Sequence, residues 1–274
     1  MKRLLLAAAL LAAGPAAAQG IPEALRGTWA QGGCTTPTAV LHLTARSVVR
    51  LPADGPARLV RLRGLRALGD WTLGTGAGAE APRVLLRAAG DALETAEPDA
   101  KLRDDRLPGD TPVRHWARCA VPPPALAVLH GEGLAALAAL ERLEAACQAG
   151  TMAPCLAALV AVADVSGDGL LGVAEVARLL RGTAWAMAAQ DGGEPEALAA
   201  AVGLGGIAAL AAARLLVDGL DFDGDGRLSA AELAQDRAAW PSGGDAAAGR
   251  PVALEALGDG AGLLRGLLER LASQ

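Results

Sequence analysis

The sequence predicts an α+β protein with two domains, a small N-terminal antiparallel β-barrel or sandwich and a helical C-terminal domain. Up to about residue 122, short apolar runs alternate with Gly, Pro and Asp, as in β-strands joined by tight turns. Beyond Pro122–Pro124, apolar residues recur at the spacing of one helix face. Because proline lacks a backbone N–H donor and favours an extended predecessor, the boundary is expected there, between residues 19–122 and 123–274.

Residues 1–18 have the pattern of a secretory signal peptide. Lys2 and Arg3 precede an apolar core that is too short to span a bilayer, and the small residues Ala16–Ala18 offer a cleavage site. The segment therefore predicts a periplasmic or secreted protein.

The four cysteines of an exported protein are expected to form two disulfides. Four cysteines allow three connectivities. The most economical one keeps a bridge within each predicted domain, and it pairs Cys34 with Cys119 and Cys147 with Cys155. A continuous helix would hold the last two Cα atoms about 12 Å apart, too far for a disulfide, so the chain is expected to break between them.

The strands of the N-terminal domain are expected within seven apolar runs, which are residues 38–44, 47–51, 57–63, 71–73, 82–87, 91–97 and 112–119. Just before these runs, the Gly-x-Trp segment at residues 25–30 weakly resembles the opening of lipocalin-like barrels. That resemblance implies a strand there and a small barrel for the whole region.

Helices are expected after the proline run and on both sides of two acidic loops, at residues 125–148, 156–163, 173–180 and 207–220, with a last amphipathic helix at 251–273. The stretch Leu198–Ala213 has no charged residue. It is short and rich in Ala and Gly, so we expect a buried core helix there and no transmembrane span in the mature chain.

Two segments of 12 residues are rich in oxygen ligands: loop one, residues 164–175, and loop two, residues 221–232. Both have acids at positions 1, 5 and 12 and a glycine at position 6, where a sharp turn needs a positive φ. Position 7 would offer a backbone carbonyl, and position 9 a hydroxyl in loop two. The predicted ligands of a hard cation are Asp164, Ser166, Asp168, Leu170 and Glu175, and Asp221, Asp223, Asp225, Arg227, Ser229 and Glu232.

These loops resemble the calcium-binding loops of the EF-hand family. Loop two matches the family pattern at every position, whereas loop one has Ser166 at position 3 and Gly172 at position 9. The resemblance implies helix–loop–helix units that bind Ca²⁺, joined back to back through Leu171 and Leu228 at position 8. Loop two begins 57 residues after loop one, farther than in most such pairs, and the extra chain is expected within residues 184–206.

Charge is divided unevenly along the chain. Residues 19–122 contain 14 basic and 11 acidic side chains, whereas residues 123–274 contain 9 basic and 19 acidic ones. Seven of those acids are predicted metal ligands, so cation binding accounts for much of the acidity. The basic residues are diffuse and no nucleic-acid-binding motif is present, so we expect no nucleic-acid partner, and no protein partner is identified.

The sequence therefore predicts an exported calcium-binding protein and not an enzyme, with calcium acting structurally or as a switch. His42, His115 and His130 lie far apart in the sequence, and no catalytic or organic-cofactor residue is predicted. Two alternatives stay open: a carrier that holds a small ligand in the β-barrel, favoured by an apolar cavity there, and a hydrolase, favoured by convergent carboxylates or a His–acid pair between the domains. Calcium is expected to stabilise only residues 123–274, unless the interface between the domains is large and apolar.

Overall fold

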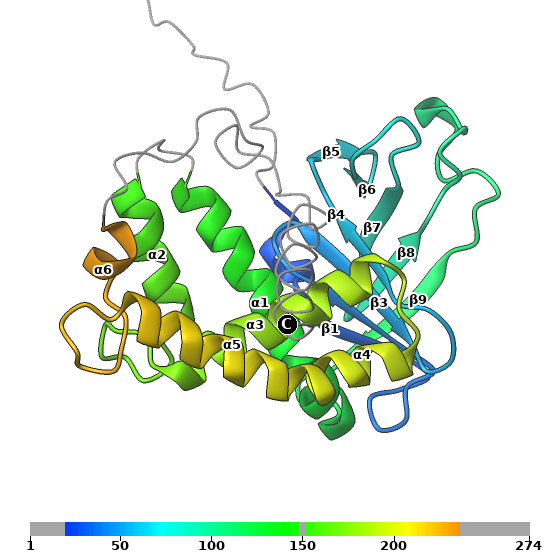
Figure 1. The fold of residues 1–274 in the computed structure, drawn as a ribbon. Coiled ribbons are helices and arrows are strands. Elements are labelled where there is room, and N and C mark those ends of the chain that lie inside the picture. Colours follow the sequence, from blue (N-terminus) through cyan, green and yellow to red (C-terminus); the bar gives the residue numbers. More distant parts are fainter. Residues whose placement is uncertain (1–19, 148–151, 236–274) are drawn as a thin grey trace, which may run out of the picture.

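The computed structural model describes residues 20–147 and 152–235, in which a curled antiparallel sheet is followed by a group of helices (Figure 1). This arrangement confirms the predicted α+β class. The predicted signal peptide and the predicted helix at 251–273 lie outside the described residues.

Within the described residues, nine antiparallel strands form one sheet in the order β4-β3-β2-β1-β9-β8-β7-β6-β5. All neighbours except β1 and β9 are consecutive in the chain, so the sheet is a meander that curls into a half-barrel, with β4 and β5 at its two edges. The strands are β1 (Gly27–Gln31), β2 (Ala39–Leu43), β3 (Ser47–Pro52), β4 (Arg58–Arg61), β5 (Gly64–Leu68), β6 (Trp71–Thr75), β7 (Arg83–Ala89), β8 (Ala92–Ala96) and β9 (Arg114–Arg118).

Each of the seven predicted runs overlaps one strand, and the segment at 25–30 contains most of β1. Strand β5 was not predicted. As an edge strand it leaves nearly all of its side chains exposed or half-buried, so it lacks the alternation that marks a half-buried strand.

The concave side of the half-barrel is filled by side chains of most of its strands. Along β3, Val48 points into this interior and Val49 points to the outer face, as expected because successive side chains of a strand alternate. Trp29 and Trp116 are almost completely buried in the interior, and their ring N–H groups donate to Leu25 O and Thr95 Oγ1, both at 2.9 Å. The scarce aromatic residues of this half therefore serve as core.

The outer face of β2, β3 and β4 shares a second hydrophobic core with the helices α1 (Pro124–Cys147), α3 (Val173–Gln190) and α4 (Pro195–Val202). Its buried members are Val40, Val49, Leu51, Ala57, Leu59, Leu126, Leu134, Leu137, Trp185, Ala186, Ala189 and Leu198. Because this interface between the sheet and the helices is extensive and apolar, we do not expect the two parts to unfold independently. We expect both to unfold together.

Two glutamates of α1 fasten this helix to the sheet. Glu144 accepts two hydrogen bonds from Arg61 Nη2, at 2.6 and 2.8 Å, and both side chains are buried. One turn earlier, Glu141 accepts from the hydroxyls of Thr44 and Ser47, at 2.5 and 2.7 Å, and from two backbone N–H groups of the β2–β3 turn. Buried carboxylates need such partners, so these contacts fix the position of α1.

Both predicted disulfides are confirmed. Cys34 pairs with Cys119 across Cα atoms 5.7 Å apart, and Cys147 pairs with Cys155 across 4.5 Å. The second bridge is possible because α1 ends at Cys147 and a new helix, α2 (Met152–Ala163), begins beyond it. Two disulfides suggest an oxidising compartment outside the cytoplasm.

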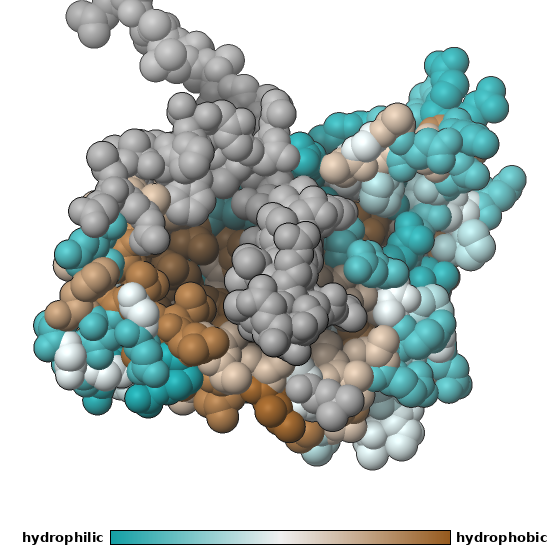
Figure 2. All heavy atoms as spheres, in the orientation of Figure 1, coloured by the Kyte–Doolittle hydropathy of each residue, from teal (hydrophilic) through white to brown (hydrophobic). Residues whose placement is uncertain are grey.

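The remaining α-helices of the described residues are α5 (Leu204–Leu220) and α6 (Ala230–Ala234), and two short 3₁₀ helices lie at Glu23–Leu25 and Asp104–Arg106. Together α4 and α5 form a run, Pro195–Leu220, that is long and apolar enough to cross a membrane by length and composition alone. Only 18% of the most apolar 18-residue stretch of this run is buried, so the expectation of a buried core helix was wrong. One face of α5 packs against α3 through small residues such as Ala213, while side chains such as Ile207 are exposed. Figure 2 shows apolar side chains along the lower edge of the molecule, over α5.

The buried pair between Arg61 and Glu144 provides a test of the shared core. Glu144→Ala leaves the guanidinium buried without this carboxylate, and loss of one partner of a buried pair costs about 3–5 kcal/mol. We expect that loss in the free energy of unfolding, measured by urea denaturation. Tryptophan fluorescence and circular dichroism should give the same midpoint. Arg103→Ala, at an exposed pair with Asp105, is the control and should cost under about 1 kcal/mol. Separate transitions for the two probes would contradict a shared core.

Candidate metal centre

Each acidic loop connects two helices that share one small hydrophobic core. Loop one joins α2 to α3, and loop two joins α5 to α6. Beneath them lies a buried cluster that consists of Val160, Ala163, Leu171, Val176, Ala177, Ala213, Val217 and Leu228. The helices therefore hold both loops at the same end of the helical layer.

The two loops have the same backbone conformation. The glycines at positions 4 and 6 have φ values of 79° and 81° in both loops, a region that side chains other than glycine rarely adopt. The first aspartate of each loop accepts hydrogen bonds from the N–H groups at positions 4 and 6, at 2.6 and 2.8 Å in loop one and at 2.7 and 2.7 Å in loop two. Separate stretches of sequence have thus folded into equivalent rings.

The last glutamate closes each ring in the same way. It accepts from the N–H groups at positions 2 and 9, at 2.8 and 2.9 Å in loop one and at 2.9 and 2.8 Å in loop two. In loop two, Ser229 Oγ also accepts from the N–H of Glu232 at 3.1 Å, which confirms the predicted helix cap. In loop one, Gly172 occupies this position and has no hydroxyl to offer.

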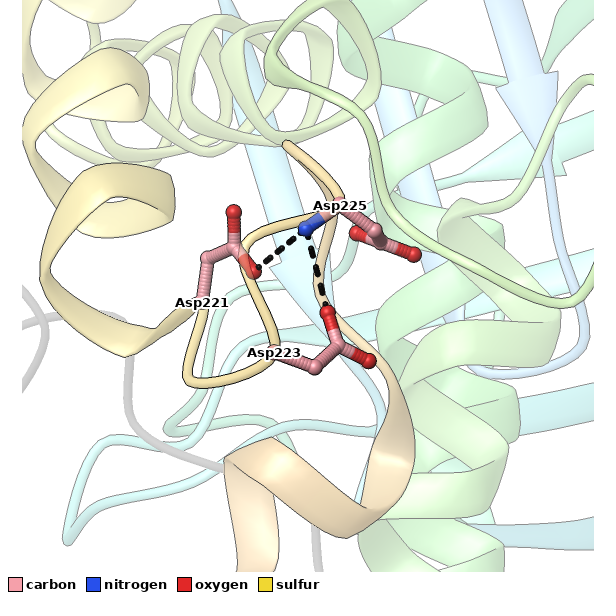
Figure 3. Close-up of side chains that lie close together, drawn as sticks. All are labelled: Asp221, Asp223 and Asp225. Atoms are coloured by element: carbon pink, nitrogen blue, oxygen red, sulfur yellow. Dashed lines mark hydrogen bonds between the residues drawn. The ribbon is translucent and has the colours of Figure 1, made fainter.

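Loop two gathers three carboxylates around one point. Oxygens of Asp221, Asp223 and Asp225 lie within 4.8 Å of one another (Figure 3). Among the described residues, no other group of three Asp, Glu, His or Cys side chains brings its ligand atoms so close together. A ring of carboxylate oxygens with little burial suits a hard cation such as Ca²⁺. This acidic cluster could therefore hold a metal ion.

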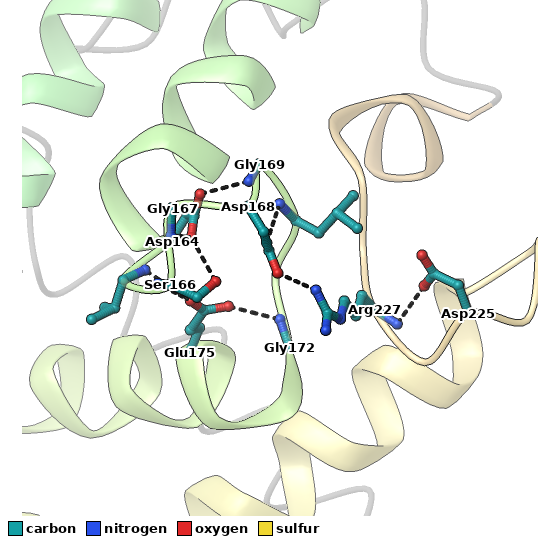
Figure 4. Close-up of polar contacts among 11 residues, drawn as sticks. Asp164, Ser166, Gly167, Asp168, Gly169, Gly172, Glu175, Asp225 and Arg227 are labelled. Atoms are coloured by element: carbon teal, nitrogen blue, oxygen red, sulfur yellow. Dashed lines mark hydrogen bonds and ion pairs between the residues drawn. The ribbon is translucent and has the colours of Figure 1, made fainter.

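Loop one is poorer in ligands. Ser166, at position 3, donates its hydroxyl to Asp164 Oδ1 at 3.1 Å, so the chain here offers a hydroxyl where loop two offers a third aspartate. Asp168, at position 5, is engaged on both oxygens: Oδ1 accepts from the N–H of Leu170 at 3.0 Å, and Oδ2 accepts from Arg227 of loop two (Figure 4). Arg227 was predicted to offer only its backbone carbonyl, and this contact of its side chain with loop one was not predicted.

The loops lie back to back through the two leucines at position 8. Leu171 and Leu228 form an isolated antiparallel bridge with N–H···O distances of 2.9 and 3.0 Å, and both side chains are buried. The long separation in sequence does not prevent this pairing, because α3, α4 and α5 take up the intervening chain. Two loops that are 57 residues apart in the sequence thus share one edge.

The loop hydrogen bonds set the charge state of the acids. The N–H of Gly169 is the main cause that lowers the pKa of Asp164, and the N–H of Ser229 is the main cause that lowers the pKa of Glu232. Both carboxylates are stabilised in the ionised form that a cation requires. As the pH falls through these lowered pKa values, that stabilisation is lost.

Asp223 behaves in the opposite sense. The N–H of Asp225 lowers its pKa, but desolvation and repulsion from Asp225, Glu232 and Asp221 outweigh that hydrogen bond, so the pKa of Asp223 is raised. Above its ordinary pKa the ionised Asp223 therefore destabilises the metal-free loop. A bound cation would remove this repulsion.

The described histidines form no acid-paired site between the sheet and the helices. Nδ1 of His42 lies 2.9 Å from Thr28 Oγ1, beside a largely apolar hollow of about 300 Å³ under α1, and burial lowers the pKa of His42. His115 does lie 3.3 Å from Glu94, but its side chain is 70% exposed on the sheet. A His–acid pair between the sheet and the helices, one of the two arrangements expected of a hydrolase, is thus not found among the described histidines.

Comparisons of the chain with protein-family models, with curated proteins and with solved structures found no match.

We expect loop two to bind calcium more tightly than loop one, because it offers four carboxylates against three. Isothermal titration of Glu232→Gln should lose the tighter of two binding phases, whereas Glu175→Gln should lose the weaker one. A greater loss of affinity from the Glu175 change would contradict this order.

Asp223→Asn separates repulsion from ligation. At neutral pH the metal-free variant should melt at a higher temperature than the wild type, because one repelling charge is gone, and its calcium affinity should fall by roughly tenfold or more. The difference in metal-free stability should shrink as the pH falls through the raised pKa of Asp223. Asp218→Asn, at an exposed ion pair on α5, is the matched control and should change neither quantity appreciably. A less stable metal-free Asp223→Asn would refute the repulsion.

Proposed function

We propose that the protein is an exported calcium-binding protein whose loops one and two form an EF-hand pair. One observation carries the proposal: two equivalent rings of backbone N–H donors and acids lie back to back through Leu171 and Leu228, and the better ring gathers the oxygens of Asp221, Asp223 and Asp225. An acidic turn without a ligand would not need this repeated geometry, and its repulsion would be a cost without compensation.

The proposed ligands have distinct tasks. The first aspartate and the last glutamate of each loop orient the backbone, because their carboxylates accept hydrogen bonds from N–H groups of the same loop. The remaining acids of loop two supply charge. When bound, Ca²⁺ would provide two positive charges that neutralise the converging carboxylates.

We infer that calcium has a structural role and is not a local switch. The bridge between the loops rests on the buried core of α2, α3 and α5, and α3 continues into the core that it shares with the sheet. Rigid loops would therefore stabilise the helices that hold the half-barrel. We propose a binding protein and no catalytic activity, in the periplasm or secreted, without a membrane span in the mature chain.

Calorimetry of the mature full-length chain tests the proposal. At a free calcium concentration one hundred times the dissociation constant, binding to the folded state adds about 2.7 kcal/mol of stability per site. We expect one unfolding transition that shifts to higher temperature with calcium, because sheet and helices share a core. The double variant Glu175→Gln/Glu232→Gln is the matched control, and its transition should not move. An equal calcium response in wild type and double variant would refute the proposed sites.

A further inference from the structure

Arg227 connects the two loops electrostatically. It occupies position 7 of loop two, where its own N–H donates to Asp225 Oδ1 at 2.8 Å. Its side chain crosses to loop one, and Nη1 pairs there with Oδ2 of Asp168, a predicted ligand at position 5 (Figure 4). One residue therefore contacts the same position of both rings, once through its backbone and once through its guanidinium.

This contact occupies a ligand of loop one. Asp168 already accepts the N–H of Leu170 on Oδ1, so its second oxygen is the one that a cation would share with Arg227. Loop one has three carboxylates, and the guanidinium offsets one of their charges. Loop one has the uncharged Leu170 at position 7, so this position of loop one provides no cation for loop two in return.

We propose that Arg227 is a built-in competitor for cations at loop one, so that loop one fills only when the guanidinium leaves Asp168. The inference rests on the proposed function and adds a regulatory element to it. The difference in affinity between the loops then has two sources, the number of carboxylates and the internal cation. The position of Arg227 beside the Leu171–Leu228 bridge makes the competition a property of the paired loops, because neither loop alone contains both partners.

The test isolates loop one by disabling loop two. Calcium titrations compare Glu232→Gln with Glu232→Gln/Arg227→Gln in the full mature chain. We expect the second variant to bind calcium at loop one roughly two- to tenfold more tightly, the range expected for a partly exposed ion pair and one nearby charge. Glu232→Gln/Arg214→Gln is the matched control. Arg214 pairs with Asp218 on α5 and not with a loop acid, so its loss should leave the affinity unchanged.

A second variant and a second measurement keep the test decisive. Arg227→Lys in the same background keeps the charge but loses the forked guanidinium, and it should bind with intermediate affinity. Circular dichroism and thermal melting establish that each variant is folded before titration. Equal or weaker calcium binding after Arg227→Gln would overturn the competition while leaving the proposed function intact. Failure of the wild type to bind calcium would instead overturn the proposed function, and the competition with it.

Discussion

The hydrophobic contact between the outer face of β2–β4 and the helices α1, α3 and α4 is the interaction on which the rest of the structure depends. Trp185 lies fully buried at its centre, and its ring N–H donates to His130 Nδ1 at 3.0 Å. The contact requires glycine where α1 and α3 meet. A Cβ atom at Gly133 would overlap the Trp185 ring, and one at Gly182 would lie 2.5 Å from Ala136 Cβ. Close packing of this kind leaves no room for even one added methyl group.

Helix α3 connects this core to the candidate metal centre. It begins at loop one, where Glu175 closes the ring, and its middle turns place Trp185 against the sheet. Just beyond its end, Gly193 O accepts a hydrogen bond from the N–H of Ala57, the residue before β4. Helix α3 thus links loop one directly to the half-barrel. This is why a cation at one end of the molecule is expected to influence the stability of the whole.

Electrostatics at the loops works against the metal-free fold. Desolvation and the converging carboxylates raise the pKa of Asp223, while backbone N–H donors lower the pKa of Asp164 and Glu232. The same fold therefore pre-arranges acids and leaves part of their repulsion uncompensated, a combination that favours binding of a cation. The pair between Arg227 and Asp168 distributes this repulsion unequally between the loops.

The sequence by itself determined the features that depend on neighbouring residues. Ring glycines, the acids at fixed spacing, the Ser229 cap and the alternation of most strands are local, because turn and capping geometry depend on a few adjacent residues. The loops could therefore be predicted, whereas the cysteine pairing was predicted by keeping one bridge within each predicted domain. Tertiary structure alone decided the half-barrel, the edge strand β5, the exposed face of α5, the core shared with the helices and the contact from Arg227 to Asp168. Each of these depends on which distant surfaces pack together, and the residue pattern of a single segment does not contain that information.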